Sequence, residues 1–276
     1  MINELQMMYS FEFMRNALLV GVFGGGLLAF LGVFIHLKRI VFLGAALPQL
    51  AALGIAVAMF LHLPFWAGAM AGVSIGMFLL SFSGKPGSLP AEGWIGLAYA
   101  AGGSIAFVLV ALAPHPDAGA LRFFTGDILG TRRGDACLAI GVAVLTALIF
   151  RLCWSKLVVV GFDPVMASTL GMRVRLWNVL LFVCLGAGLA TVMNTAGGML
   201  AFSMLVGPPA ASLILFRSFS RVVFATVALG ALSAFAGLTL SFVYDLPGGP
   251  AMATAALFPV IPLWGIRQVV RFRRHG

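Results

Sequence analysis

Long apolar segments separated by short polar intervals run through the whole sequence, and charged residues fall almost entirely in the intervals. Nine of these segments are about as long as a helix that crosses a bilayer. They occupy residues 16–35, 42–61, 65–81, 93–113, 136–154, 176–193, 199–216, 222–244 and 251–266. We therefore expect an all-α fold, in which a polytopic transmembrane bundle of about nine spans forms one domain over residues 1–276. Eight spans remain possible, if one segment does not cross the membrane.

Composition and charge agree with a membrane protein. The chain is 62% hydrophobic and 9% charged, whereas a soluble domain carries roughly a quarter charged residues. The net charge of +9 does not predict nucleic-acid binding, because the basic residues form no clustered face with interleaved aromatic residues. With alternating spans, 13 of the 17 Lys and Arg residues fall on one side, which is the pattern of the cytoplasmic side.

That charge bias predicts an orientation. It places the interval at residues 156–175 and the basic tail at residues 267–276 in the cytoplasm, and the N-terminus outside. The location that we expect is a bacterial-type plasma (inner) membrane, in contact with lipid.

The chain shows no energy-coupling chemistry of its own. It contains no Gly-x-x-x-x-Gly-Lys-[Ser/Thr] loop to hold ATP phosphates. The apolar segments also carry no Asp, Glu, His or Arg near their centres, where ion-driven carriers usually place such residues. No catalytic residues are identified, so we do not expect an enzyme. If the chain moves a solute uphill, the energy must come from another polypeptide.

The interval at residues 156–175 has the signals of a short helix outside the membrane. Asp163 is a suitable N-cap, and Pro164 suits a first helical position because its fixed φ and missing N–H cost nothing there. Val165 to Leu170 can form the helix, and Gly171 fits its end. The alternative interpretation is an ordinary connecting loop.

Four motifs, taken in order, resemble those of a known family. They lie at residues 121–129 (LRFFTGDIL), 162–171 (FDPVMASTLG), 197–211 (GGMLAFSMLVGPPAA) and 241–250 (SFVYDLPGGP). In this respect the chain resembles the membrane permease subunits of zinc/manganese/iron-type ABC importers. Each motif is weak alone, but the four in this order are fairly specific, and the likeness extends over nearly the whole chain.

The resemblance implies a set of partners and a coupling role. A homodimer of this chain would bind two copies of a cytoplasmic ATP-binding subunit and an extracytoplasmic solute-binding protein. ATP and Mg would be bound by the partner subunit, and no cofactor by this chain. The family's coupling motif falls on Phe162, Asp163, Pro164, Ala167 and Gly171, which would transmit closure of the ATPase to the spans.

The second apolar segment departs from the family's metal-binding pattern. The Asp and His that the family usually carries there correspond to Ala45 and Gln49. Because Ala offers no ligand and Gln only a weak carbonyl, the resemblance leaves the metal site unknown. Three interpretations stay open: loose passage of a cation past carbonyls, Gln49 and water; a metal chelate or another small solute; or Gln49 as a structural bridge between helices.

Further residues are candidates for the translocation pathway. Pro48 can free backbone carbonyls beside Gln49. Asn194 is either a helix stop or part of an external gate, and Pro208, followed by Pro209, is expected to kink its helix. Ser203 lies in the third motif and completes the candidate set, which is Gln49, Pro48, Asn194, Ser203 and Pro208.

The last motif predicts a rigid turn at the outer surface. Its residues are Asp245, Pro247, Gly249 and Pro250, and Pro and Gly favour turns because of their restricted and permissive φ angles. Contact with a solute-binding protein is the second interpretation.

Together these features predict the membrane-spanning permease subunit of an ATP-driven ABC importer for a metal ion, such as zinc or manganese, or for a metal chelate. The alternatives are a stand-alone secondary carrier or channel for a small solute, and a membrane scaffold that transports nothing.

Overall fold

The computed structural model describes residues 10–80, 91–112, 128–265 and 267, and within them every regular element is a helix. This confirms the all-α prediction. The elements are α2 (Glu12–Leu19), the π-helical turn η1 (Val20–Gly24), α3 (Gly25–Leu37), α4 (Leu43–Phe60), α5 (Phe65–Leu80), α6 (Ala91–Leu112), the 3₁₀ turn η2 (Ile128–Gly130), α8 (Arg133–Phe162), α9 (Pro164–Thr169), α10 (Val174–Leu215), α11 (Phe219–Tyr244) and α12 (Gly248–Leu257).

Seven helical stretches in the described residues are long and apolar enough to cross a membrane. They are Glu12–Leu37, Leu43–Phe60, Glu92–Leu112, Arg133–Phe162, Val174–Met193, Thr195–Leu215 and Phe219–Tyr244. Each corresponds to one of the nine expected spans. The other two are shorter than expected, because α5 has 16 residues and α12 has 10 before a turn at Phe258 and Pro259.

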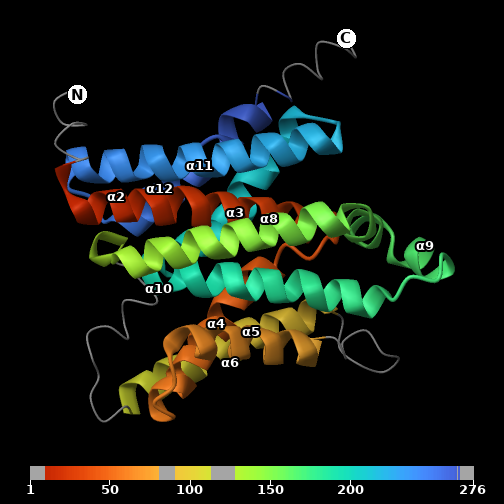
Figure 1. Cartoon of the computed structure of the whole chain (residues 1–276), viewed down its shortest axis with the longest axis horizontal. Helices are drawn as coiled ribbons and strands as arrows, with labels where there is room; N and C mark the ends of the chain where they lie inside the picture. The colour runs from red at the N-terminus through yellow and green to blue at the C-terminus, as the bar shows by residue number, and fades with distance from the viewer. Residues whose placement is uncertain (1–9, 81–90, 113–127, 266, 268–276) are drawn as a thin grey trace.

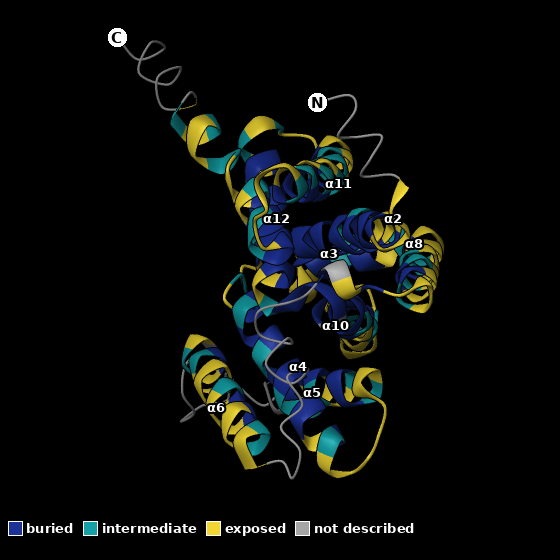
Figure 2. Ribbon diagram, turned by 90° about the vertical axis from the view of Figure 1, so that its left-hand side faces the viewer, coloured by how far each residue is buried: buried dark blue, intermediate teal, exposed yellow. Residues whose placement is uncertain are grey.

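The helices form two groups around a buried core. Helix α3 lies at the centre of the larger group and is buried along most of its length, with α8, α10 and α11 around it (Figure 2). Helix α12 packs against α10 and α11. Helices α4, α5 and α6 form a smaller group in the lower part of Figure 1, which is joined to the rest through α10. Outward faces of α6 and α8 are exposed and apolar, as expected for helices that face lipid.

Helix α10 is a pair of spans that reverses direction at Gly197. The glycine has φ 81° and ψ 168°, a conformation that L-residues rarely adopt. A Cβ atom placed on Gly24 would lie 2.7 Å from Val192, and one on Gly25 would lie 3.4 Å from Met204. Val192 and Met204 thus lie beside two adjacent residues of the chain, whereas a straight helix would separate them by about 18 Å. The chain therefore turns back at Gly197, and the expected spans at residues 176–193 and 199–216 are both present.

The bundle has two opposite ends. At the end that carries α9, at the right of Figure 1, the ring of Phe162 lies 5.2 Å from that of Phe219 at the start of α11. At the other end, the ring of Phe11 lies 6.4 Å from that of Phe242, and Glu12 forms an ion pair with Arg133. We call these the α9 end and the far end.

One detail of the expected helices is wrong. The fifth span does not stop at residue 154, because α8 continues to Phe162 past a local distortion at Cys153. The apolar face continues through the buried residues Leu157 and Val160, while Lys156 lies over the ring of Trp177. The interval at residues 156–175 is thus partly the last turns of α8.

The kink expected at the Pro208–Pro209 pair stays a prediction. The backbone keeps helical dihedral angles at both prolines, and the non-helical residue within α10 is Gly197. Both prolines are buried, and a Cβ on Gly32 of α3 would lie 2.9 Å from the ring of Pro209. Neighbouring helices therefore enclose this segment, in which Pro donates no backbone hydrogen bond.

Candidate functional site: the α9 segment and the α4–α6 face

Helix α9 begins where the sequence predicts. Oδ1 of Asp163 accepts hydrogen bonds from the backbone N–H groups of Val165 and Met166, each at 2.9 Å. Pro164 occupies the first helical position. Two of the backbone donors that a helix start leaves unpaired are therefore satisfied by one carboxylate, and a third is removed by the proline.

The end of α9 is equally well defined. Gly171 has φ 73° and donates its N–H to the carbonyl of Ser168 at 3.0 Å, and the N–H of Met172 reaches the carbonyl of Ala167 at 3.1 Å. These two bonds form the arrangement in which a left-handed glycine closes a helix. A helix of only six residues is thus fixed at both ends by its own sequence.

One face of α9 is buried and the other is exposed and apolar. Ala167 has no exposed surface, while Val165, Met166 and Leu170 are 71%, 55% and 61% exposed. Residues of this kind are not usually left in water at the end of a polar-capped helix unless another protein covers them. The face formed by Val165, Met166 and Leu170 is called the α9 apolar face below.

The start of α9 at Phe162 and Asp163, which we call its root, is attached to the bundle through aromatic rings. Phe219 contacts Phe162 at 5.2 Å and Trp154 at 5.7 Å, and Phe34 of α3 lies 6.2 Å from Phe219. These distances are typical of favourable aromatic pairs. The aromatic cluster, which also includes Phe30 and Phe150, connects the α9 segment with α3, α8 and α11.

Lys38 makes a second connection at the same end. Its Nζ donates to Oδ1 of Asn178 at 2.7 Å and to the carbonyl of Val160 at 3.3 Å. One side chain at the end of α3 therefore joins α8 and α10 on either side of α9. Burial lowers the pKa of Lys38 below its ordinary value of 10.5, because an ammonium group loses hydration when it is enclosed.

The candidate residues of α4 lie on two different surfaces. Pro48 is buried against the reversal of α10, where a Cβ on Gly198 would lie 3.3 Å from that of Pro48. Gln49 faces α6 instead, since a Cβ on Gly103 would lie 2.8 Å from its Oε1. Ala45 and Gln49 are four residues apart and both half-buried, so they share this α4–α6 face.

Gln49 is not used as a bridge between helices within the described residues. Its side chain makes no hydrogen bond there, although Gly102 and Gly103 let α6 approach closely. The amide is therefore available to a solute or to water on the α4–α6 face.

The remaining pathway candidates are not gathered around Gln49. Ser203 is buried and donates its hydroxyl to the carbonyl of Met199 in its own helix at 2.9 Å. Pro208 is buried further along the same helix. The backbone of Asn194 belongs to α10, and its side chain lies outside the described residues.

The last motif forms a tight turn at the far end. Asp245 ends α11 with φ 52°, and Ser241 donates its hydroxyl to the carbonyl of Leu246 at 2.6 Å. Pro247 is the N-cap of α12. Gly249 is buried, and Pro250 is half-buried in the first turn of α12, so the motif joins two helices with a short, hydrogen-bonded connection.

Among the described residues, no three His, Cys, Asp or Glu side chains come together in a group that could hold a metal ion. Most of the first family motif, at residues 121–127, lies outside the described residues. The structure also shows two contacts that the sequence did not indicate: the hydrogen bond from Lys38 to Asn178, and the aromatic cluster. Each joins residues far apart in the chain, and no local pattern marks them.

Comparison with known proteins adds relatives of similar length. The chain is 25% identical over 259 residues to the manganese import system permease protein ScaB of Streptococcus gordonii, covering 93% of each chain. It is 28% identical over 262 residues to a probable iron transport system membrane protein of Haemophilus influenzae, covering 92% of this chain and 90% of the other.

Solved structures share the fold. PsaBC from Streptococcus pneumoniae, solved in complex with Fab, matches with a TM-score of 0.87 at 22% identity, over 96% of this chain and 95% of that chain. The sequence model of one family, the ABC 3 transport family, matches residues 10–264, which is nearly the whole chain. The protein therefore belongs to the ABC 3 transport family.

Proposed function

We propose that this chain is the membrane-spanning permease subunit of an ATP-driven importer, and that it passes a metal ion or a metal chelate. The observation that carries the proposal is the α9 segment: a short helix capped at both ends, with Val165, Met166 and Leu170 exposed at one end of the bundle. Family membership over residues 10–264 agrees with it. The manganese and iron systems named among the relatives support a metal as the cargo.

The α9 apolar face is the docking surface for the ATP-binding subunit in this proposal. ATP and Mg are bound by that subunit, since this sequence has no phosphate-binding loop. Asp163 and Gly171 keep α9 rigid, and the aromatic cluster and Lys38 fasten its root to α3, α8 and α10. Closure of the ATPase can then move these helices as one body, and such a movement can open one end of a pathway while closing the other.

Orientation and assembly follow from the same proposal. The α9 end faces the cytoplasm, which also holds most of the basic residues. The far end, with Asp245 and its turn, faces the extracytoplasmic solute-binding protein. Two copies of the chain form a homodimer, with the pathway between them.

The α4–α6 face is the candidate contact for the cargo. Gln49 offers one amide oxygen and Ala45 offers none, so a bare zinc or manganese ion would find a weak ligand set there. A hydrated ion or a chelate that arrives with its own ligands needs fewer protein ligands, and the free amide of Gln49 can hydrogen-bond either one.

A charge placed on the α9 apolar face tests the coupling role. Val165→Glu and Leu170→Glu should each reduce co-purification with the ATP-binding subunit and abolish stimulated ATP hydrolysis, because a carboxylate would have to be desolvated on docking. Tyr244→Glu is the matched control, since Tyr244 is 67% exposed at the far end. Unchanged association in the α9 variants would overturn the docking role.

Transport by the purified chain separates the importer from a stand-alone carrier or channel. Vesicles that hold this chain alone should show no uptake of Mn²⁺, Zn²⁺ or chelated iron. Vesicles that also hold the ATP-binding subunit should take up cargo when ATP and the solute-binding protein are supplied. Uptake by the chain alone would refute the proposal. Gln49→Ala should change which of these cargoes is accepted and leave association with the ATPase intact.

A further inference from the structure

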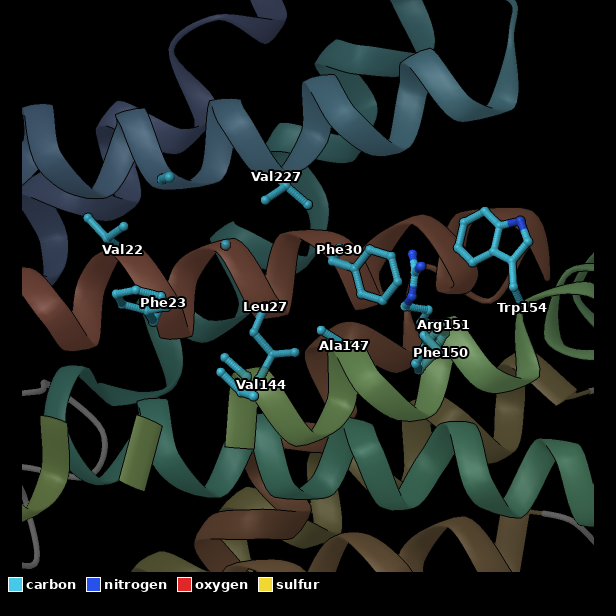
Figure 3. Close-up of a pocket in the computed structure, with 13 residues that line it drawn as sticks. Val22, Phe23, Leu27, Phe30, Val144, Ala147, Phe150, Arg151, Trp154 and Val227 are labelled. Atoms are coloured by element: carbon cyan, nitrogen blue, oxygen red, sulfur yellow. The ribbon is translucent and has the colours of Figure 1, made fainter. Parts of the chain in front are cut away.

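A groove opens on the outward side of α3, between α8 and α11 (Figure 3). Its cavity measures about 770 Å³. Leu27 and Phe150 form part of its floor and are 6% and 2% exposed, whereas Val144 and Val227 on its sides are 58% and 37% exposed. The groove is therefore an apolar channel that is open along its length on an outer surface of the bundle.

One charged side chain lies in this apolar channel. Arg151 is the only charged residue among those that line it, and Figure 3 shows it between Phe30 and Trp154. Within the described residues, Arg151 forms no ion pair and no hydrogen bond from its side chain. An arginine beside apolar surface at membrane depth is costly unless it reaches an anion or the headgroup layer.

The position of Arg151 gives the groove a polar end and an apolar end. Trp154, one turn further along α8, contacts Phe219 at the α9 end of the bundle, and tryptophan is typical of the membrane interface. From Arg151 the groove runs past Phe30 and Leu27 to Phe23, towards the far end. A molecule that fits needs an anionic group at the α9 end and a long apolar part.

We propose that the groove between α3, α8 and α11 is a binding site for an anionic phospholipid. The guanidinium of Arg151 contacts the lipid phosphate, and an acyl chain lies in the channel over Leu27 and Phe23. The charge complementarity of one arginine in an otherwise apolar channel selects this occupant over a protein segment. Phe150 and Trp154 belong to both the groove and the aromatic cluster, so the bound lipid contacts the residues that hold the root of α9.

Lipid binding can be measured on the purified full-length chain without ATP or cargo, so the result does not depend on the proposed function. Delipidated protein is titrated with phosphatidylglycerol or phosphatidylcholine, and bound lipid is counted by native mass spectrometry. We expect phosphatidylglycerol to be preferred, and Arg151→Gln to weaken its binding by about fivefold, the effect of removing one basic residue near an anionic surface. Arg151→Lys should keep most of the preference.

Two further variants keep the proposal open to refutation. Ala147→Phe, which fills the groove without a change of charge, should reduce binding of both lipids. Arg175→Gln, at an exposed arginine outside the groove, should have no effect. Equal losses in the Arg151→Gln and Arg175→Gln variants, or unchanged lipid binding in the Ala147→Phe variant, would overturn the site. A shift from dimer to monomer caused by Ala147→Phe would also overturn it, because the groove would then be covered by a second copy.

Discussion

Helices meet in two different ways in this bundle. Helices α4 and α5 touch through glycine: a Cβ on Gly54 would lie 2.0 Å from the carbonyl oxygen of Gly68, and one on Gly72 would lie 2.2 Å from that of Leu50. Helices α3 and α8 meet instead through large rings, with Phe150 at 4.8 Å from Phe30 and 5.0 Å from Phe34.

The difference separates a rigid contact from an adjustable one. Two backbones in direct contact have no side chain that can move to relieve a strain, and such packing gives close association in a membrane. Rings can change rotamer and shift against each other, at a cost. The glycine contact holds the group that carries Gln49, while the aromatic cluster holds α9 and borders the groove.

A valine in the glycine contact between α4 and α5 should destabilise the protein more than any other change considered below. Gly72→Val places a side chain where its first atom already overlaps a carbonyl oxygen, so α4 and α5 must separate. We expect a loss of at least about 3 kcal/mol, at or beyond the upper range for overpacked cores. The measurement is thermal unfolding of the purified protein in detergent. Gly141→Val is the control, because nothing lies within 4 Å of a Cβ atom added at Gly141. Equal losses of stability in the two variants would mean that the glycine contact is not tight.

Removal of a ring from the aromatic cluster should lower the unfolding free energy by less than Gly72→Val does. Phe150→Ala leaves a cavity beside Phe30 and Phe34, and buried Phe→Ala changes cost about 3–5 kcal/mol in soluble proteins. We expect a loss near the lower limit of that range. Exposing apolar side chains to lipid costs little, because lipid tails are as apolar as the protein core. Phe224→Ala, at a ring that is 79% exposed, should change the unfolding free energy by less than about 0.5 kcal/mol. A small change for Phe150 would show that the rings repack freely.

The pH dependence of stability tests Lys38, which joins the aromatic side of the bundle to α10. Because burial lowers its pKa in the folded state, the folded protein releases this proton at a lower pH than the unfolded chain does. The cost of burying the charge is complete below the lowered pKa and is relieved as the pH rises towards 10.5. The wild type should therefore gain stability in that window, and Lys38→Met should not.

Lys38→Met also removes the hydrogen bond from Lys38 to Asn178. A bond from a charged group contributes about 1.5–3 kcal/mol, but Lys38→Met also removes the cost of burying the charge. At neutral pH the variant should therefore lose less stability than the bond alone contributes. Urea unfolding across a pH series gives both quantities. Lys156→Met, at an exposed lysine near the same end, serves as the control and should retain the pH dependence of the wild type.

The smallest expected effect concerns the cap of α9. Asp163→Ala removes the acceptor of two backbone N–H groups, which should cost about 1 kcal/mol. Hydrogen exchange at Val165 and Met166 should quicken about fivefold, while global stability changes little. Asp163→Asn should behave as the wild type, since its side-chain oxygen can accept the same bonds. Equal exchange in the Ala variant would mean that packing of Ala167, and not the cap, holds α9.

Local signals made the α9 segment predictable. Asp163, Pro164 and Gly171 each act through backbone geometry within a few residues, so the sequence was sufficient to place a helix between them. The all-α fold was also predictable, because a membrane leaves few alternatives for apolar segments of this length.

Other features depended on distant neighbours. The extension of α8 to Phe162 relies on the burial of Leu157 and Val160 against other helices. Lys38 looked like one more basic residue at a helix end, and only its position beside Asn178, 140 residues away in the chain, makes it a connection. The direction of Gln49 towards Gly103 was likewise not readable from residues near it.

The sharp reversal at Gly197 bears on how the protein enters the membrane during synthesis. The two halves of α10 are joined without a loop. The first half therefore cannot insert fully while the second remains in water, and the two must enter the membrane together as a hairpin. A tag or cleavage site introduced between them would have to separate two spans that pack directly at the turn.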